Sequence, residues 1–312
     1  MVSFRYHVVT IVAVFLAIGL GILMGTTVVK QGVIEELRNR ADAAVKTTHG
    51  LQKDVTDLRG QLQGWNNVAP QLQHVLVTGQ LAGRSVVVVT SEGVDFSEID
   101  GVRKILGDAG ANVSGVLVMT SRMALTDDGL RQRLAGVLGL SGPSDQAELS
   151  RQAAAALALR LSGGAPPDMK TANLIDQLAQ GQFLQKQFVG SGGVQQLGGA
   201  DQPVVVLGGG GGAPAVDPQA FFVPLVDSLV QSNHPVVVAE TFDTSYDFVS
   251  LIRQDGGADG RVLTVDDADQ MPGRVALVLG LRNMLDSGAG GCQDFGVKPG
   301  ACGSIPTPTA TP

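Results

Sequence analysis

The two cysteines are the residues of this chain with the most distinctive chemistry. Cys292 and Cys302 are separated by nine residues that include glycine and proline, and the first 291 residues contain no cysteine. As thiolates, such a pair can bind a soft metal ion, and as a disulfide it closes a small loop in an oxidising compartment. We expect the disulfide. Because a disulfide has no thiolate, the pair is a metal-ligand candidate only when it is reduced.

A glycine-rich stretch is the second feature that could bind a ligand. Gly208, Gly210 and Ala213 follow a run of valines at the G-x-G-x-x-A spacing that holds dinucleotide phosphates. Glu240 closes the next apolar run, where a ribose-binding acid would stand. Pro214 stiffens the turn, however, and the acid comes later than the usual interval of about 20 residues. No P-loop lysine follows either, so we expect a long loop between a strand and a helix instead of a nucleotide site.

Several carboxylates follow predicted strands, at the edge of a parallel sheet where ligand sites usually form. Acids at these positions are also ordinary N-caps of the helices that come next. Both interpretations stay open at this point. The residues concerned are Glu240, Asp243, Asp247, Asp266 and Asp267.

The remaining residue types give no catalytic pattern. The chain has no G-x-S-x-G, H-E-x-x-H or C-x-x-C sequence, and its seven methionines are scattered. Each of the four histidines is expected to be solvated or structural: His7, His49, His74 and His234. We therefore expect that the protein is not an enzyme.

Residues 8–29 form an uncharged apolar run, and its location relative to the membrane determines where the rest of the chain can lie. Its 22 residues span about 33 Å as a helix, enough to cross a hydrocarbon core of roughly 30 Å. A cleaved secretory signal is the alternative, but this run is longer than a signal's apolar region and no A-x-A site follows. The run predicts an uncleaved membrane anchor over residues 1–29, with the lipid bilayer as its partner.

The orientation of the anchor does not follow from its flanking charges. Arg5 stands on one side, and Lys30, Arg38 and Arg40 stand on the other. The cysteine pair and the Pro/Thr-rich end of the chain favour an exported C-terminal part. We therefore expect a single-pass protein of the cell membrane with its bulk outside the cytoplasm.

The segment after the anchor has the apolar spacing of a coiled coil. Small or apolar residues recur at intervals of three and four, with charged residues on the other faces. This predicts a stalk over residues 30–64 that ends near Gly60, Gly64, Trp65 and Pro70. A surface helix packed on its own domain is the alternative. The coiled-coil seam consists of Ile34, Leu37, Ala41, Ala44, Thr48, Leu51, Val55, Leu58 and Leu62.

Small residues also recur every four positions inside the anchor, at Ala17, Gly21 and Gly25. Such spacing lets two transmembrane helices approach closely. Together with the seam, it predicts a homodimer or a hetero-oligomer with another membrane protein. Nucleic acid is not an expected partner, because the net charge is −7 and no cluster of lysine and arginine occurs.

Residues 65–290 predict an extracytoplasmic α/β domain. Continuous Val/Leu runs at residues 85–90, 113–119, 203–207, 235–239 and 261–265 lack polar alternation, as in strands buried on both faces of a parallel sheet. Helical stretches alternate with them, at 97–109, 127–138, 146–161, 172–188, 218–231, 246–254 and 271–285. The pattern predicts a mainly parallel-sheet, Rossmann-like layered domain. Residues 291–312 are expected to form a flexible Cys/Pro/Thr tail.

The opening of the chain, with Ser3-Phe4-Arg5-Tyr6-His7 before the long apolar helix, resembles the actinobacterial copper-transport protein B (MctB-like) family. The coiled-coil segment, SVVVVT and the closing VDDADQMPGRVALVLGLRNML extend the resemblance over most of the chain. The resemblance implies a role in keeping intracellular copper low, with efflux as one route. For close relatives it also implies pairing with a second membrane protein that controls peptidoglycan hydrolysis during cell separation. It carries over no ligand residues.

Two hypotheses about function remain open from the sequence. In the first, the protein acts in copper efflux or homeostasis, with copper as its cargo. Cu(I) prefers clustered methionine, cysteine or histidine, and only the cysteine pair offers such a cluster. In the second, the protein is a non-enzymatic scaffold that binds a membrane partner through its stalk, since one apolar helix cannot line a pore alone.

Overall fold

The computed structural model describes residues 4–141, 145–163, 173–189, 197–244, 246–254, 261–287 and 293–303, with the side chains of 4, 5, 26–35 and 66 excepted. The chain forms two units, Met1–Val68 and Ala69–Pro312.

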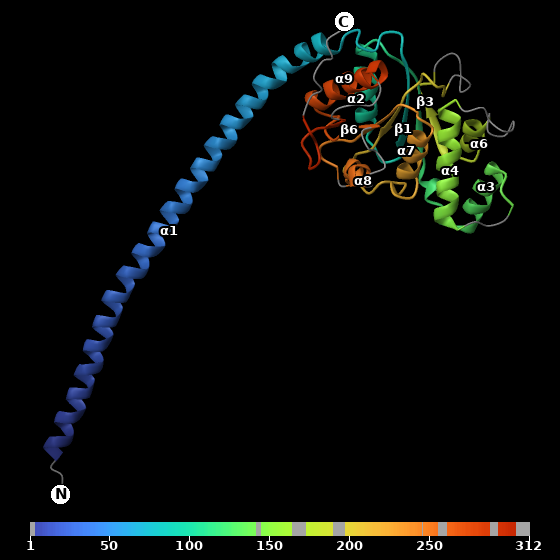
Figure 1. The fold of residues 1–312 in the computed structure, drawn as a ribbon. Coiled ribbons are helices and arrows are strands. Elements are labelled where there is room, and N and C mark those ends of the chain that lie inside the picture. The colour runs from blue at the N-terminus through green and yellow to red at the C-terminus, as the bar shows by residue number, and fades with distance from the viewer. Residues whose placement is uncertain are drawn as a thin grey trace. The chain divides into compact units, whose positions relative to one another are not determined.

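One long helix, α1, spans Phe4–Val77 and contains Pro70 (Figure 1). The predicted end of the helical stalk near Gly60 and Gly64 is wrong, because the helix passes through both residues without a break. A glycine inside a helix weakens it by only about 1 kcal/mol, which the neighbouring turns of a long helix can absorb. Val77, the last residue of α1, is buried in the second unit.

The second unit is built on a seven-stranded sheet in the order β3-β2-β1-β4-β5-β6-β7. Every pairing is parallel except that of β3 with β2. The prediction of a mostly parallel α/β domain is confirmed, and each predicted strand lies within one residue of an observed one. The strands are β1 Ser85–Ser91, β2 Asn112–Met119, β3 Leu184–Gln187, β4 Val204–Leu207, β5 Val236–Ala239, β6 Val262–Val265 and β7 Asp294–Phe295.

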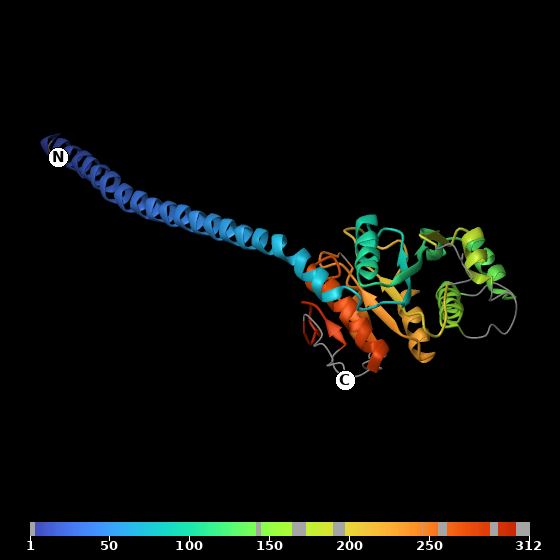
Figure 2. The ribbon, with the colours of Figure 1, turned by 90° about the horizontal axis from the view of Figure 1, so that it is seen from above.

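Helices cover both faces of the sheet (Figures 1 and 2). Along β1, Val86 and Val88 pack with α2 and α9, whereas Val87 and Val89 pack with the helices of the other face. Successive side chains of a strand point to opposite faces, so an unbroken valine run is what a sheet covered on both sides requires. One face carries α2 (Phe96–Asp108) and α9 (Met271–Ser287), and the other carries α3 (Asp128–Leu138), α4 (Gln146–Leu161), α6 (Leu174–Gln180), α7 (Phe222–Gln231) and α8 (Phe248–Gln254).

The predicted helix at 172–188 is wrong over its second half. α6 ends at Gln180, Gln182 has a φ of +59°, and the chain turns back into β3, antiparallel to β2. Phe183 is fully buried and Leu184 nearly so at this turn, which anchors the turn to the domain core. The burial of these two side chains outweighs the helical spacing of the sequence, so a turn and a strand form here instead of a longer helix.

The C-terminal segment also differs from the expectation of a flexible tail. Residues 293–303 contain β7, which pairs with β6, and Gly303 forms a further bridge to Phe295. Residues 288–292 and 304–312 lie outside the described part of the chain. Because the described segment extends the sheet, the side chains that follow β7 lie beside the carboxyl ends of β5 and β6.

Candidate functional site

The glycine-rich loop after β4 is closed by the protein itself. A methyl group at Gly209 would lie 2.5 Å from the Thr241 hydroxyl oxygen, and one at Gly210 would lie 2.6 Å from the Gly93 carbonyl oxygen. Both glycines have positive φ, of +125° and +110°. The cavity over the loop, between Gly208 and Phe248, measures about 20 Å³, room for about one water molecule. The glycine-rich loop is therefore a turn that packs closely against Thr241 and Gly93.

Three of the five predicted carboxylates, Glu240, Asp247 and Asp266, form ion pairs at the carboxyl edge of the sheet. Glu240, at the end of β5, is fully buried, and its Oε1 accepts a hydrogen bond of 2.7 Å from Lys298 Nζ. Its Oε2 accepts from the Val249 amide at 3.0 Å, and Lys298 also donates to Asp247 at 3.0 Å. Burial raises the pKa of Glu240 to about 7, against the lowering effect of Lys298.

A second buried pair lies beside the first. Arg253 Nη1 donates to Asp266 Oδ2 at 2.7 Å, with both side chains almost completely buried. Arg253 also donates to the Thr264 hydroxyl and to the Phe295 carbonyl oxygen. Asp266 in turn accepts from the backbone amides of Val297 and Lys298. These bonds tie the segment after β7 to the sheet.

The two ion pairs show that the acids at this edge of the sheet hold the C-terminal segment. Glu240 and Asp266 act as acceptors for the C-terminal segment, while Asp243 is exposed on the surface. The sequence analysis predicts neither of the two cations, Lys298 and Arg253, as a partner of these acids. Lys298 lies in the segment that is expected to be a flexible tail. A signal was available, since carboxylates at the ends of fully buried strands require cationic or amide partners.

Asp267 is the one predicted acid whose environment is unsatisfied. Its side chain is 3% exposed, and among the described residues its Oδ1 has no hydrogen-bond partner. Burial, followed by the nearby charges of Asp266 and Asp269, raises its pKa to about 6. The folded protein therefore binds the Asp267 proton more tightly than the unfolded chain does, and it releases this proton at about pH 6.

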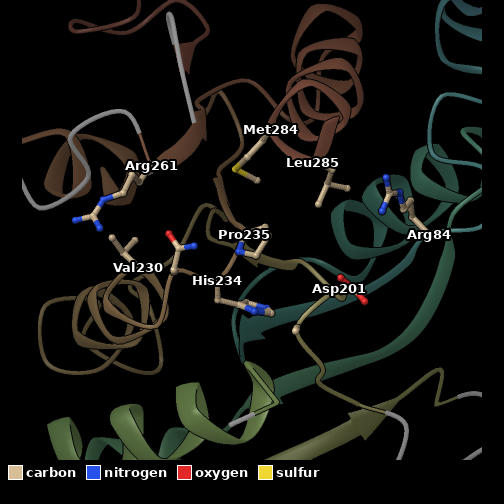
Figure 3. A pocket seen from close by; sticks show the side chains of 10 residues that line it. Arg84, Asp201, Val230, His234, Pro235, Arg261, Met284 and Leu285 are labelled. Carbon is tan, nitrogen blue, oxygen red and sulfur yellow. The ribbon is translucent and has the colours of Figure 1, made fainter. Parts of the chain in front are cut away.

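A second cavity, of about 290 Å³, opens at the amino edge of the sheet (Figure 3). Arg84 and Arg261 stand at opposite sides of it, with Met284 and Leu285 of α9 between them. The buried His234 holds the Gln202 carbonyl oxygen at 2.9 Å through Nε2, and burial lowers the pKa of this imidazole.

In the part of the chain that the structure describes, no three His, Cys, Asp or Glu side chains gather in a way that could hold a metal ion. Cys302 is disulfide-bonded, and its Sγ lies 3.2 Å from the Asp294 carbonyl oxygen. Cys292 lies outside the described residues, so the pairing of the two cysteines stays a prediction.

The predicted coiled-coil seam lies on α1 with its larger side chains in solvent. Leu37, Leu51, Leu58 and Leu62 are between 56% and 61% exposed, and Val55 is 44% exposed. The side chain of Ile34 is outside the described set. The three small residues of the anchor also lie on α1, and a methyl group added at Gly21 or Gly25 would contact nothing within 4 Å.

Among the described residues, one stretch of α1 is long and apolar enough to cross a membrane. This stretch is Tyr6–Gly25, 20 residues with a mean hydropathy of 2.7, and none of it is buried in the protein. Length and composition of the stretch fit the predicted membrane anchor.

Comparisons with known proteins address the chain as a whole. A family model described as "Copper transport outer membrane protein, MctB" matches residues 1–306. The copper transporter MctB of Mycobacterium tuberculosis (strain ATCC 25618 / H37Rv) is 26% identical over 312 residues, which cover 92% of this chain and 94% of the relative. The copper transporter MctB of Mycobacterium leprae (strain TN) is 27% identical over 318 residues, which cover 96% and 98%. The family match spans the anchor, the long helix and the α/β domain together, and the chain therefore belongs to the MctB family of copper transport outer membrane proteins.

Proposed function

We propose that the protein lowers intracellular copper as a single-pass membrane protein that takes part in copper efflux. The family match over residues 1–306 is the observation that carries this proposal. The relatives named copper transporter MctB are covered over 94% to 98% of their length, so the proposal concerns the whole architecture.

Copper is the cargo in this proposal, with no resident metal site assigned. One apolar helix offers no polar lining for an ion, and Tyr6–Gly25 contains no charged residue. The chain therefore acts within an assembly, in which several copies or a further membrane protein provide the route for the ion.

The test is the copper content of cells that lack the gene. Such cells, grown with added copper, are compared with cells in which the full chain is restored, and metals are measured by mass spectrometry. We expect restored cells to hold less copper at an unchanged zinc content. Equal copper contents with and without the chain would contradict the proposal.

A further inference from the structure

The apolar spacing on α1 continues past the predicted end of the stalk. Beyond Leu62, the same alternation of three and four residues runs to within one residue of the helix end. It selects Trp65, Ala69, Leu72 and Leu76. Trp65 is 62% exposed, Leu72 42% and Leu76 38%. We call the seam from residue 34 to residue 76 the extended seam.

Residues that weaken helices stand away from the extended seam. With Ile34 at heptad position a, the four residues Gly50, Gly60, Gly64 and Pro70 take positions b, c and f. These positions face outward in a coiled coil. The seam is therefore free of glycine and proline along its whole length, although α1 contains both.

The residue types in the first part of the seam favour a parallel two-stranded arrangement. Three of the seven a positions are β-branched, Ile34, Thr48 and Val55, and the other four are Ala41, Leu62, Ala69 and Leu76. Position d has leucine at residues 37, 51 and 58. β-branched residues at a with leucine at d favour parallel dimers. Two copies anchored in one membrane through Tyr6–Gly25 also enter the seam from the same end.

The charged residues beside the seam indicate that the partner of α1 is a second copy of the same chain. Asp54 takes position g and Arg59 takes position e of the following heptad. These two positions face each other across a parallel, in-register pair. The contact occurs twice in a homodimer, and none of the other g–e pairs along the seam brings like charges together. Within the described part of its own chain, neither residue forms an ion pair.

We propose that α1 is the dimerisation element of the protein. Two copies pair in parallel and in register along the extended seam, and Asp54 of each copy faces Arg59 of the other. This inference goes beyond the proposed function, and it stands whether or not copper is the cargo.

The pairing has a consequence for the anchor. An α-helix turns about 100° per residue, so Gly25 lies about 180° around an unbroken α1 from Ile34. The stripe of Ala17, Gly21 and Gly25 therefore points away from the dimer contact. The seam and the stripe cannot both serve one straight pairing of two copies.

Cross-linking in native membranes tests the pairing. Leu58→Cys places a thiol on the seam, and Lys53→Cys places one at the outward position f of the same stretch. A short bismaleimide should join two full-length Leu58→Cys chains and leave Lys53→Cys and the unmodified chain monomeric. Equal cross-linking of both variants, or none at Leu58→Cys, would overturn the proposal.

A charge exchange tests the identity of the partner. Asp54→Arg alone and Arg59→Asp alone each place like charges across the pair, and self-association of the full chain in detergent should weaken about tenfold. Chains of the two variants, carrying different tags and mixed, restore both attractions and should form heterodimers as readily as the unmodified chain forms dimers. Full self-association of either variant, or no recovery in the mixture, would reject a second copy at this seam.

Discussion

At the scale of single residues, the carboxyl edge of the sheet is governed by buried charge. Glu240 and Asp266 are fully buried and each meets a cation, whereas Asp267 meets none among the described residues. A buried carboxylate is tolerated when it is paired and otherwise retains its proton. The three acids therefore differ in what they do to stability, although they are chemically alike.

Lys298→Met should lower the free energy of unfolding by about 3 kcal/mol near pH 8, because the buried Glu240 must then either carry an unpaired charge or bind a proton that the unfolded chain does not bind at this pH. The loss should shrink in acid, where the Glu240 carboxyl becomes neutral, given a pKa of about 7 with Lys298 in place. Denaturant unfolding of the full chain at several pH values measures this. Lys186→Met is the matched control: its pair with Asp176 has the same 2.7 Å distance but is exposed, and its loss should be below about 1 kcal/mol.

Asp267→Asn should stabilise the protein above pH 6 and have little effect near pH 4. The pKa of Asp267 is raised from 3.8 to about 6, so the folded state holds this proton more tightly than the unfolded state. The stability that the group contributes is present below pH 3.8 and is lost as the pH rises to about 6. Melting temperature against pH measures the effect, with the exposed Asp243→Asn as the control. A variant with the same pH profile as the unmodified chain would refute this account of Asp267.

The cysteine pair yields a chemical prediction at the same scale. With Cys302 in a disulfide, we expect the exported protein to show no alkylatable thiol by intact mass until a reductant is added. Two thiols without reductant would contradict the Cys292–Cys302 bridge and with it the argument for an exported C-terminal part.

At the scale of elements, the sequence was most informative where burial and spacing agree. The valine runs of β1, β4 and β5 could be recognised because strands buried on both faces need no polar alternation. β3 is not predicted because only four residues pair at the sheet edge, and β7 is not predicted because only two residues pair with β6. Backbone hydrogen bonds to β6 and a further bond from the Arg253 side chain hold β7 in place. Such short strands depend on tertiary contacts, and these leave no periodic signal.

The C-terminal end of α1 lies beyond the end that is predicted for the stalk. Gly60, Gly64 and Pro70 predict a stop, yet α1 continues through all three to Val77. The apolar spacing continues beyond them and is the stronger signal. A helix-weakening residue lowers the stability of a long helix locally and does not by itself end the helix.

The triple variant Leu51→Asp, Val55→Asp and Leu58→Asp should abolish dimerisation of the full chain, because six added carboxylates would face one another across the dimer seam. His49→Asp, Thr56→Asp and Gln63→Asp add the same charge at outward positions and should leave the dimer intact. Sedimentation in density-matched detergent distinguishes monomer from dimer. A dimer that survives the seam substitutions would remove the seam as the contact.

At the scale of the whole molecule, one family match spans the apolar N-terminal stretch, the long helix and the α/β domain together. The apolar stretch Tyr6–Gly25 has the length and composition of a membrane anchor, and in our proposal the seam on α1 brings two copies together. The glycine-rich loop packs closely against Thr241 and Gly93, and the ion pairs at the carboxyl edge of the sheet fasten the C-terminal segment.

The central claim is that the membrane-anchored chain promotes copper efflux, and the most direct measurement is the rate at which preloaded cells lose copper. Cells without the gene are compared with cells that express either the full chain or residues 36–312 behind a cleaved secretion signal. We predict faster copper loss with the full chain than with the anchor-free chain or with no chain, at equal protein levels. Equal rates of loss in all three strains would contradict the account.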